Sequence, residues 1–174
     1  GMVPVERGPS QVGLEAVGDA TIDEGDLWQL QLRPAGVIQA GDKLAYSFVS
    51  QVPSGVQLEQ ATGALAWRPA EDQGPGDYAL TIRLSVLRQG RSTHADQTLR
   101  VTVREVESPP TIEPVPPQTL GGGAPALRLT LRARDPDLPA SPLRFTLGPD
   151  APAGAAIDEK TGVLTWQPAA NQGG

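Results

Sequence analysis

The residues of this chain that could do chemistry are almost all carboxylates. The sequence has 20 Asp and Glu residues, no cysteine, and one histidine, His94, which we expect in an exposed hairpin loop. Nucleophilic and zinc sites need His or Cys partners, and a lone histidine has none to join it. The acids Glu71-Asp72 and Asp158-Glu159 are adjacent in expected loops, a spacing that does not build the facing carboxylates of a glycosidase. We therefore expect no enzyme activity, no catalytic residue and no bound organic cofactor.

Composition excludes further classes of partner. The net charge is −6 and no basic stripe interleaves with aromatic residues, so nucleic-acid binding has no support. No apolar run reaches the roughly 18 residues that span a bilayer, so we expect no membrane insertion within this segment. Without cysteine there is no disulfide or zinc–thiolate site. Gly1 before Met2 indicates a remnant of tag removal, and we assign residues 1–11 to an N-terminal tail.

An internal repeat organises the chain. The stretch Pro53–Gly74 returns as Pro152–Gly173 at a constant offset of 99 residues, without a gap and with 10 of 22 positions identical. A period this long indicates two copies of a whole domain rather than the short units of a solenoid. We expect domain one at residues 12–107 and a partial domain two at residues 108–174, joined by a short linker that Pro109-Pro110 stiffens.

Alternating apolar and polar residues predict half-buried β-strands. The runs are Leu27–Leu32, Leu44–Phe48, Tyr78–Val86 and Thr98–Val103. Turn-forming Gly, Pro and Asp residues separate them, and no window of 11 or more residues shows a helical stripe. Seven short strands at this spacing favour an all-β sandwich.

The second copy is incomplete. Gly174 corresponds to Pro75, so nothing in copy two matches Asp77–Arg104, which supplies the last two strands of copy one. A sandwich without those strands exposes unpaired backbone and one side of its core. We expect that the parent chain continues beyond this segment. The alternative is that a partner supplies the missing strands in trans.

Two motifs resemble the bacterial putative Ig domain family, the cadherin-like modules found in haemagglutinins and other surface proteins. The motifs are Thr62–Pro69 and Thr161–Pro168, both of the form Thr-Gly-x-Leu-x-Trp-x-Pro. The resemblance implies two tandem Ig-like/cadherin-like Greek-key sandwiches, the second lacking its last two strands. The residues agree with it, since the Thr-Gly turn leads into a strand that sends Leu and Trp to one face. We expect Trp67 and Trp166 in the core, with carbohydrate stacking as the alternative.

The resemblance also implies a metal, because neighbouring cadherin-like repeats share calcium at their junction. Calcium takes six to eight oxygen ligands, several of them from carboxylates. Asp135 and Asp137 follow the Leu-rich strand of copy two, where cadherin-type repeats place an Asp-x-Asp pair, and Glu107 lies in the linker. Glu24 and Asp72 could complete an interdomain calcium site at the same pole.

Other residues at these positions weaken the calcium prediction. Arg104 and Val106 stand where the cadherin linker places oxygen ligands, and the arginine adds positive charge. Copy one has Gly36 and Ile38 at the positions of the Asp pair in copy two. Asp135-Pro136-Asp137 is then simply a turn, which Asp side chains favour.

The function that follows is a non-enzymatic structural or adhesive module of a bacterial secreted or cell-surface protein, acting as a spacer or interaction domain. Its partners would be other repeats of the same chain, surface proteins or glycans. One alternative is an accessory carbohydrate-binding module of a secreted hydrolase. Another is assembly by strand exchange through the incomplete second domain.

Overall fold

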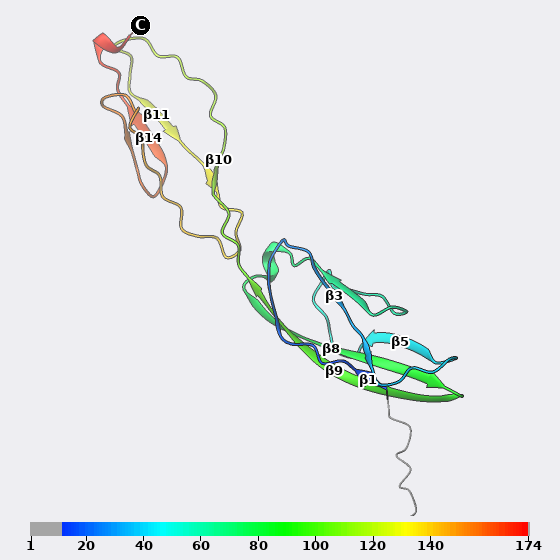
Figure 1. Ribbon diagram of the computed structural model, residues 1–174. Helices are drawn as coiled ribbons and strands as arrows, with labels where there is room; N and C mark the ends of the chain where they lie inside the picture. Colours follow the sequence, from blue (N-terminus) through cyan, green and yellow to red (C-terminus); the bar gives the residue numbers. More distant parts are fainter. Residues whose placement is uncertain (1–11, 174) are drawn as a thin grey trace, which may run out of the picture. The chain divides into compact units, whose positions relative to one another are not determined.

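The computed structural model describes residues 12–173, and over that range it contains strands and two 3-10 turns but no α-helix (Figure 1). The chain divides into two compact units, unit one ending at Val106 and unit two beginning at Glu107. Neither 3-10 turn of the described range is long or apolar enough to cross a bilayer. The all-β prediction is confirmed, whereas the predicted N-terminal tail lies outside the described residues.

Unit one is built from strands that form two main sheets. Its elements are β1 (Gly13–Leu14), β2 (Ala20–Asp23), β3 (Trp28–Gln31), β4 (Pro34–Ala35), β5 (Lys43–Phe48), β6 (Gln57–Leu58), β7 (Ala64–Trp67), the 3-10 turn η1 (Glu71–Gln73), β8 (Gly76–Arg88) and β9 (Arg91–Arg104). One sheet has the order β2-β9-β8-β5 and the other β3-β7-β6, while β1 and β4 form a short extra pair. All pairs are antiparallel except β2–β9, which is parallel. This is the two-sheet arrangement of an Ig-like sandwich.

The core of unit one lies between the two sheets. Period-two alternation turns Leu80, Ile82, Leu84 and Val86 of β8 inward, and each is at most 2% exposed. Trp67 of β7 is 1% exposed. The Trp67 ring meets the Tyr78 ring edge to face, with centroids 5.1 Å apart, the geometry that aromatic quadrupoles favour. The prediction that Trp67 is a core residue is correct.

The long hairpin of β8 and β9 turns at Gln89 and Gly90, and Figure 1 shows it as the two long green arrows. Both turn residues have positive φ, 48° and 76°, as a two-residue turn matched to strand twist requires. His94 therefore lies on strand β9 opposite Ser85, not in the hairpin loop that the sequence suggested. It is exposed, as expected.

An ion pair fastens the tip of this hairpin to the start of β5. Arg88 donates from Nε and Nη2 to the two carboxylate oxygens of Asp42, at 2.9 and 2.6 Å. The hydrogen bonds from Arg88, and next the one from the Gln39 N–H, lower the pKa of Asp42 to about 2. Copy two has Ser141 at this position, so the pair belongs to unit one alone.

Acid is expected to weaken unit one through Asp42. A carboxyl whose pKa is about 2 when folded, against 3.8 ordinarily, stabilises the fold above its unfolded pKa, and that contribution is lost as the pH falls from about 4 to 2. Asp42→Asn should lower the urea midpoint at pH 7 and flatten its decline between pH 4 and 2. Asp96→Asn, which removes a more exposed pair with Arg83, is the control and should flatten it less. Parallel pH profiles for wild type and Asp42→Asn would refute the assignment.

Unit two reproduces one sheet of unit one residue for residue. Its elements are β10 (Thr111–Ile112), β11 (Leu127–Thr130), β12 (Ala133–Arg134), β13 (Ala156–Ile157), β14 (Val163–Trp166) and the 3-10 turn η2 (Ala170–Gln172). The sheet β11-β14-β13 matches β3-β7-β6 at the offset of 99, with the same register: Leu127 opposes Trp166 as Trp28 opposes Trp67. The repeat seen in the sequence is therefore also a repeat of backbone geometry.

Within its described residues, unit two has no counterpart of the sheet β2-β9-β8-β5. In unit one, β5 pairs with β8 and β2 pairs with β9. The counterparts of β5 and β2, residues 142–147 and 119–122, form no strand in the described chain. Trp166 is consequently only partly buried, so the prediction that it is a core residue like Trp67 is wrong in degree. The motif is the same, but among residues 12–173 no second sheet covers it.

Candidate functional site

The five predicted calcium ligands fall in both units. Glu24 and Asp72 belong to unit one, and Glu107, Asp135 and Asp137 belong to unit two. Asp72 and Glu107 are exposed, whereas Glu24 is 5% and Asp137 3% exposed. Calcium binding by this set remains a prediction.

A compact carboxylate group lies at one end of unit one, and it includes only Glu24 of the predicted set. Carboxylate oxygens of Glu24, Glu71 and Glu105 all lie within 4.8 Å of one another. We call these three residues the acidic cluster. Oxygens so close can contact one ion, since Ca²⁺–O distances are about 2.3–2.6 Å. Three carboxylates supply part of the six to eight oxygens that calcium takes, leaving room for carbonyls or water.

The strand register explains why these acids meet. Asp23 is the register partner of Arg104 in the parallel β2–β9 pair, so Glu24 and Glu105 leave the sheet side by side. The Glu24 N–H donates to the Arg104 carbonyl at 3.1 Å and extends the pairing by one residue. Glu71 comes from a different segment, the first residue of η1. Parallel pairing of β2 with β9 thus brings Glu24 and Glu105 together, and η1 adds Glu71.

Glu24 is the most buried member of the acidic cluster. Its Oε1 accepts a hydrogen bond from the Val106 N–H at 3.1 Å. Its Oε2 is buried and has no hydrogen-bond partner within the described residues. Gly74 gives the carboxylate its room, because a Cβ there would collide with Glu24 Oε2 and lie 3.1 Å from the Arg104 carbonyl oxygen. A buried carboxylate oxygen without a donor is costly unless a cation compensates it.

The Arg104 side chain does not oppose a cation in the way the sequence suggested. Its Nε donates to Asp23 Oδ1 at 2.7 Å, so the guanidinium is bound to a carboxylate outside the cluster. Asp23 partly neutralises that charge at an exposed position. The linker arginine is therefore paired with Asp23 rather than with a carboxylate of the acidic cluster.

Asp135 and Asp137 accept hydrogen bonds from backbone groups of unit two. Asp135 Oδ1 accepts from the Asp137 N–H at 2.9 Å, and Oδ2 accepts from the Ser141 N–H at 2.8 Å. Both oxygens of Asp137 accept from the Ser108 N–H, at 3.0 and 2.9 Å. The Asp135 bonds are the local side-chain-to-backbone bonds by which Asp shapes turns, as the turn interpretation expects. The Asp137 bonds are long-range and join the turn to Ser108, 29 residues earlier.

Sequence reasoning missed Glu71 and Glu105 by one and two residues. It selected Asp72, the exposed neighbour of Glu71, and Glu107 rather than Glu105. The signal that could have found Glu105 is its place directly after the last strand, level with the residue that follows β2. No local pattern distinguishes Glu71 from Asp72, because the direction of each side chain depends on how η1 turns.

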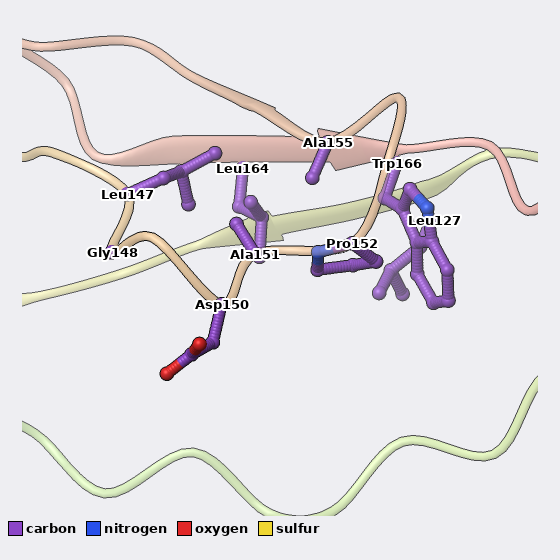
Figure 2. Close-up of a pocket in the computed structure, with 9 residues that line it drawn as sticks. All are labelled: Leu127, Leu147, Gly148, Asp150, Ala151, Pro152, Ala155, Leu164 and Trp166. Atoms are coloured by element: carbon purple, nitrogen blue, oxygen red, sulfur yellow. The ribbon is translucent and has the colours of Figure 1, made fainter.

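A second feature is an open apolar cavity of about 360 Å³ in unit two. Its lining includes Leu127, Leu147, Ala151, Pro152, Leu164 and Trp166. Figure 2 shows the Trp166 ring beside Leu127 at one end and Leu147 at the other. Asp150 is the one titratable residue in the lining. We call this surface the open face of unit two.

Solved structures with a similar fold include cadherin ectodomains. Mouse cadherin-23 domains EC22–24 match with a TM-score of 0.51 and 15% identity, over 91% of this chain and 54% of that one. The protocadherin GammaB4 extracellular domain matches with a TM-score of 0.46 and 16% identity, over 91% of this chain and 29% of that one. Drosophila N-cadherin EC1–4 matches with a TM-score of 0.45 and 21% identity, over 88% of this chain and 40% of that one. The chain thus spans from about a third to about half of these proteins. At such identities the likeness concerns the fold.

Sequence comparison identifies the family. A search of curated protein sequences found no match. The family model described as a putative Ig domain matches residues 11–104, more than half of the chain. That range covers the complete sandwich of unit one from before β1 to the end of β9. The chain belongs to the putative Ig domain family.

Proposed function

We propose that this chain is a non-enzymatic structural module of a bacterial secreted or cell-surface protein, serving as a load-bearing spacer and interaction domain. The observation that supports this role is the parallel pairing of β2 with β9. Force on the two ends of unit one pulls these strands in opposite directions along their length. All hydrogen bonds between them are then loaded together, in shear, rather than broken one after another.

Side chains reinforce the β2–β9 pair at its exit. The Asp23–Arg104 ion pair bridges its last register position, and Glu24 continues the contact through the Arg104 carbonyl and the Val106 N–H. Forced unfolding is controlled by the unfolding barrier, so contacts broken early along the pulling direction set the strength. A spacer that must stay folded under tension benefits from this arrangement.

Single-molecule pulling tests the proposal. The sequence has no cysteine, so engineered cysteines are unique attachment points. Force applied between cysteines at positions 19 and 106 (Asp19→Cys, Val106→Cys) loads the β2–β9 pair in shear. Force applied between positions 26 and 106 (Asp26→Cys, Val106→Cys) separates the two strands from one end. We expect a clearly higher unfolding force for the first pair. Ala20→Pro should reduce it, because the Ala20 N–H faces β9 by the same alternation that points the Glu24 N–H at Arg104. Equal forces in the two geometries would contradict the spacer role.

We further propose that the acidic cluster binds calcium and stiffens this end of unit one. Calcium would join β2, η1 and the exit of β9 through Glu24, Glu71 and Glu105. The support is the buried Glu24 Oε2 without a donor within the described residues, together with the space kept open at Gly74. Charge repulsion between the three carboxylates would fall when a cation binds.

Thermal unfolding in calcium and in chelator tests this site. Calcium at about 100 times its Kd should stabilise unit one by about 2.7 kcal/mol. Glu24→Gln should remove the shift while keeping the fold in chelator, because a Gln oxygen can still accept from Val106 and one repelling charge is gone. Asp72→Asn, one residue from Glu71, is the matched control. A shift that persists in Glu24→Gln but is lost in Asp72→Asn or Asp135→Asn would favour the ligands chosen from sequence instead.

The open face of unit two gives little support to the carbohydrate-binding alternative. Trp166 is partly exposed there and could stack on a sugar, but its Nε1 already donates to the Ala153 carbonyl. Sugar recognition also needs convergent polar groups, and the cavity lining offers one titratable side chain. A glycan array that shows saturable binding would revive this alternative.

A further inference from the structure

Three exposed arginines of unit two lie on one side of its sheet. They are Arg128 in β11, Arg132, and Arg134 in β12. From residue 127 to residue 134 the odd-numbered residues are partly buried and the even-numbered ones exposed, so period-two alternation turns all three arginines the same way. Leu127 lines the cavity of the open face, so the arginines point away from that face. We call Arg128, Arg132 and Arg134 the arginine row.

The arginine row carries three positive charges that form no ion pair among residues 12–173. Other arginines do form ion pairs, namely Arg83, Arg88, Arg104 and Arg144. At about 3.3 Å of rise per residue, the last two members of the row are about 7 Å apart and the whole row spans about 20 Å. Charges about 7 Å apart are within the Debye length of about 8 Å at physiological ionic strength, so they repel one another. A bound anion would relieve that repulsion.

Unit one shows that the fold does not require the arginine row. At the offset of 99, Gln29 and Ala35 stand where unit two has Arg128 and Arg134. Unit one also shows that this side of the sheet stays open to solvent in a complete sandwich, because Gln29 and Gln31 are exposed although β8 and β9 are present. The exposure of the row is therefore independent of what covers the open face.

Threonine hydroxyls accompany the arginine row. Thr165 is the register partner of Arg128. Thr111 is the register partner of Arg134, and Thr130 lies between the two arginines in the same extended segment. Register partners lie on the same face of a sheet, so these hydroxyls and the guanidiniums share one surface. A guanidinium presents a planar fork of donors that fits a carboxylate, and a hydroxyl can both donate and accept.

We propose that this surface of unit two binds a linear polysaccharide built from uronic acid units, which carry carboxylates. The inference rests on the proposed role as an interaction domain and names its partner class. Guanidiniums would bind carboxylates along the extended polymer through charge-assisted hydrogen bonds, and the threonine hydroxyls would bind sugar hydroxyls. The site lies on the opposite side of the sheet from Trp166, so it does not depend on stacking against that ring.

Two other kinds of polyanion fit this surface less well. An extended acidic peptide binds a sheet chiefly by backbone pairing at a free edge, whereas β14 already pairs with β11 on one side and β13 on the other. Single-stranded nucleic acid gains much of its affinity from bases that stack on aromatic side chains. The arginine row and its threonine neighbours include no aromatic residue. Side-chain recognition of carboxylates and hydroxyls therefore favours an acidic polysaccharide.

One acid lies beside the arginine row and gives the proposal a sharp test. The Glu113 N–H donates to the Arg132 carbonyl at 2.8 Å, so the two residues are opposite each other next to the β10–β12 pair. The Glu113 side chain is exposed and makes no ion pair with Arg132 in the described part of the chain. Its carboxylate would repel an acidic ligand. Glu113→Gln should therefore raise the affinity about twofold.

Titration of the full chain with oligogalacturonides, followed by calorimetry and NMR, tests the proposal. We expect saturable binding that weakens as salt is added, with NMR shifts at Leu127–Arg134 rather than in unit one. The methyl-esterified form of the same oligosaccharides carries no charge and should not bind. Arg128→Gln combined with Arg134→Ala should weaken binding about fivefold or more, since each exposed charge pair contributes roughly two- to fivefold. Copy one has these same residue types at the matching positions, so the double variant should fold.

Two matched controls remove an arginine elsewhere. Arg33→Gln changes the counterpart of Arg132 in unit one, and Arg144→Gln changes an exposed arginine of unit two that pairs with Glu159. Both should bind as wild type. Absence of binding, equal binding of the esterified form, or equal losses in Arg144→Gln and the double variant would overturn the proposal. Tighter binding of poly-glutamate or of a single-stranded oligonucleotide would assign the surface to that polyanion instead. The pulling experiment reports on unit one alone, so its failure is distinguishable from failure of this proposal.

Discussion

Replacing Trp67 with alanine is expected to destabilise unit one by about 3–5 kcal/mol, the usual cost of removing a fully buried tryptophan. The side chain is 1% exposed and packs edge to face against Tyr78, so its loss leaves a large cavity and removes an aromatic contact. Its Nε1 has no hydrogen-bond partner within the described residues, so no polar bond is lost with it. The equivalent Trp166→Ala should cost unit two much less, because Trp166 is only partly buried.

The comparison between the two tryptophans is the informative part of this experiment. Both stand in the same Thr-Gly-x-Leu-x-Trp-x-Pro motif and in the same strand register. Urea unfolding followed by NMR signals of each unit separates their effects. A small domain typically has about 5–15 kcal/mol of stability, so Trp67→Ala could unfold a large share of unit one. Equal losses for Trp67→Ala and Trp166→Ala would show that unit two buries its tryptophan as fully as unit one.

Gly63→Ala is expected to destabilise unit one by about 2–5 kcal/mol, from two causes that act together. Gly63 has a φ of +75°, in the left-handed region where a Cβ costs about 1–2 kcal/mol. A Cβ there would also lie 2.8–3.0 Å from ring atoms of Tyr46, which is 4% exposed and cannot move aside freely. Overpacking of this kind costs about 1–3 kcal/mol more.

Gly41→Ala separates the two causes. Gly41 has a φ of +89°, but a Cβ there meets nothing within 4 Å, so its substitution measures the backbone cost alone. The free energy of unfolding measured by chemical denaturation should be clearly lower for Gly63→Ala than for Gly41→Ala. Shortening Tyr46 to leucine should make the Gly63→Ala change less costly, because the obstructing ring is removed. If Gly63→Ala and Gly41→Ala cost the same, the Tyr46 contact does not limit the turn.

Copy two uses the same turn under the same constraint. Gly162 has a φ of +70°, and a Cβ there would lie 2.7 Å from the Leu131 carbonyl oxygen and 3.0 Å from the Phe145 ring. Phe145 is the counterpart of Tyr46. The Thr-Gly pair that marked the repeat in the sequence therefore marks a place where only glycine fits between the turn and an aromatic ring.

Local patterns were enough to predict five strands of unit one and the repeat. Alternation located β3, β5, β8 and β9, and the Thr-Gly turn located β7. These predictions succeeded because side-chain period and turn chemistry depend on neighbouring residues. The prediction that His94 lies in the hairpin loop was wrong, because strand β9 runs through a stretch of polar residues that includes it. The turn of the hairpin falls at Gln89-Gly90, where both φ angles are positive.

Long-range pairing could not be predicted from these patterns. The acidic cluster depends on β2 lying parallel to a strand some 80 residues later, and on η1 turning Glu71 rather than Asp72 inward. The burial of Trp166 likewise depends on strands that its own motif does not contain. Sequence gave the right local structure at Trp166 and the wrong environment, since burial is a property of the whole sandwich.

Amide hydrogen exchange is the measurement that tests the account most directly. Its central claim is that unit one is a closed sandwich and unit two carries the same sheet with one face open. The amides of β7 should then exchange only through unfolding of unit one, whereas the matched amides of β14 should exchange orders of magnitude faster through local opening. Comparable protection of β7 and β14 in the isolated chain would contradict the account, because it would mean that the open face is covered.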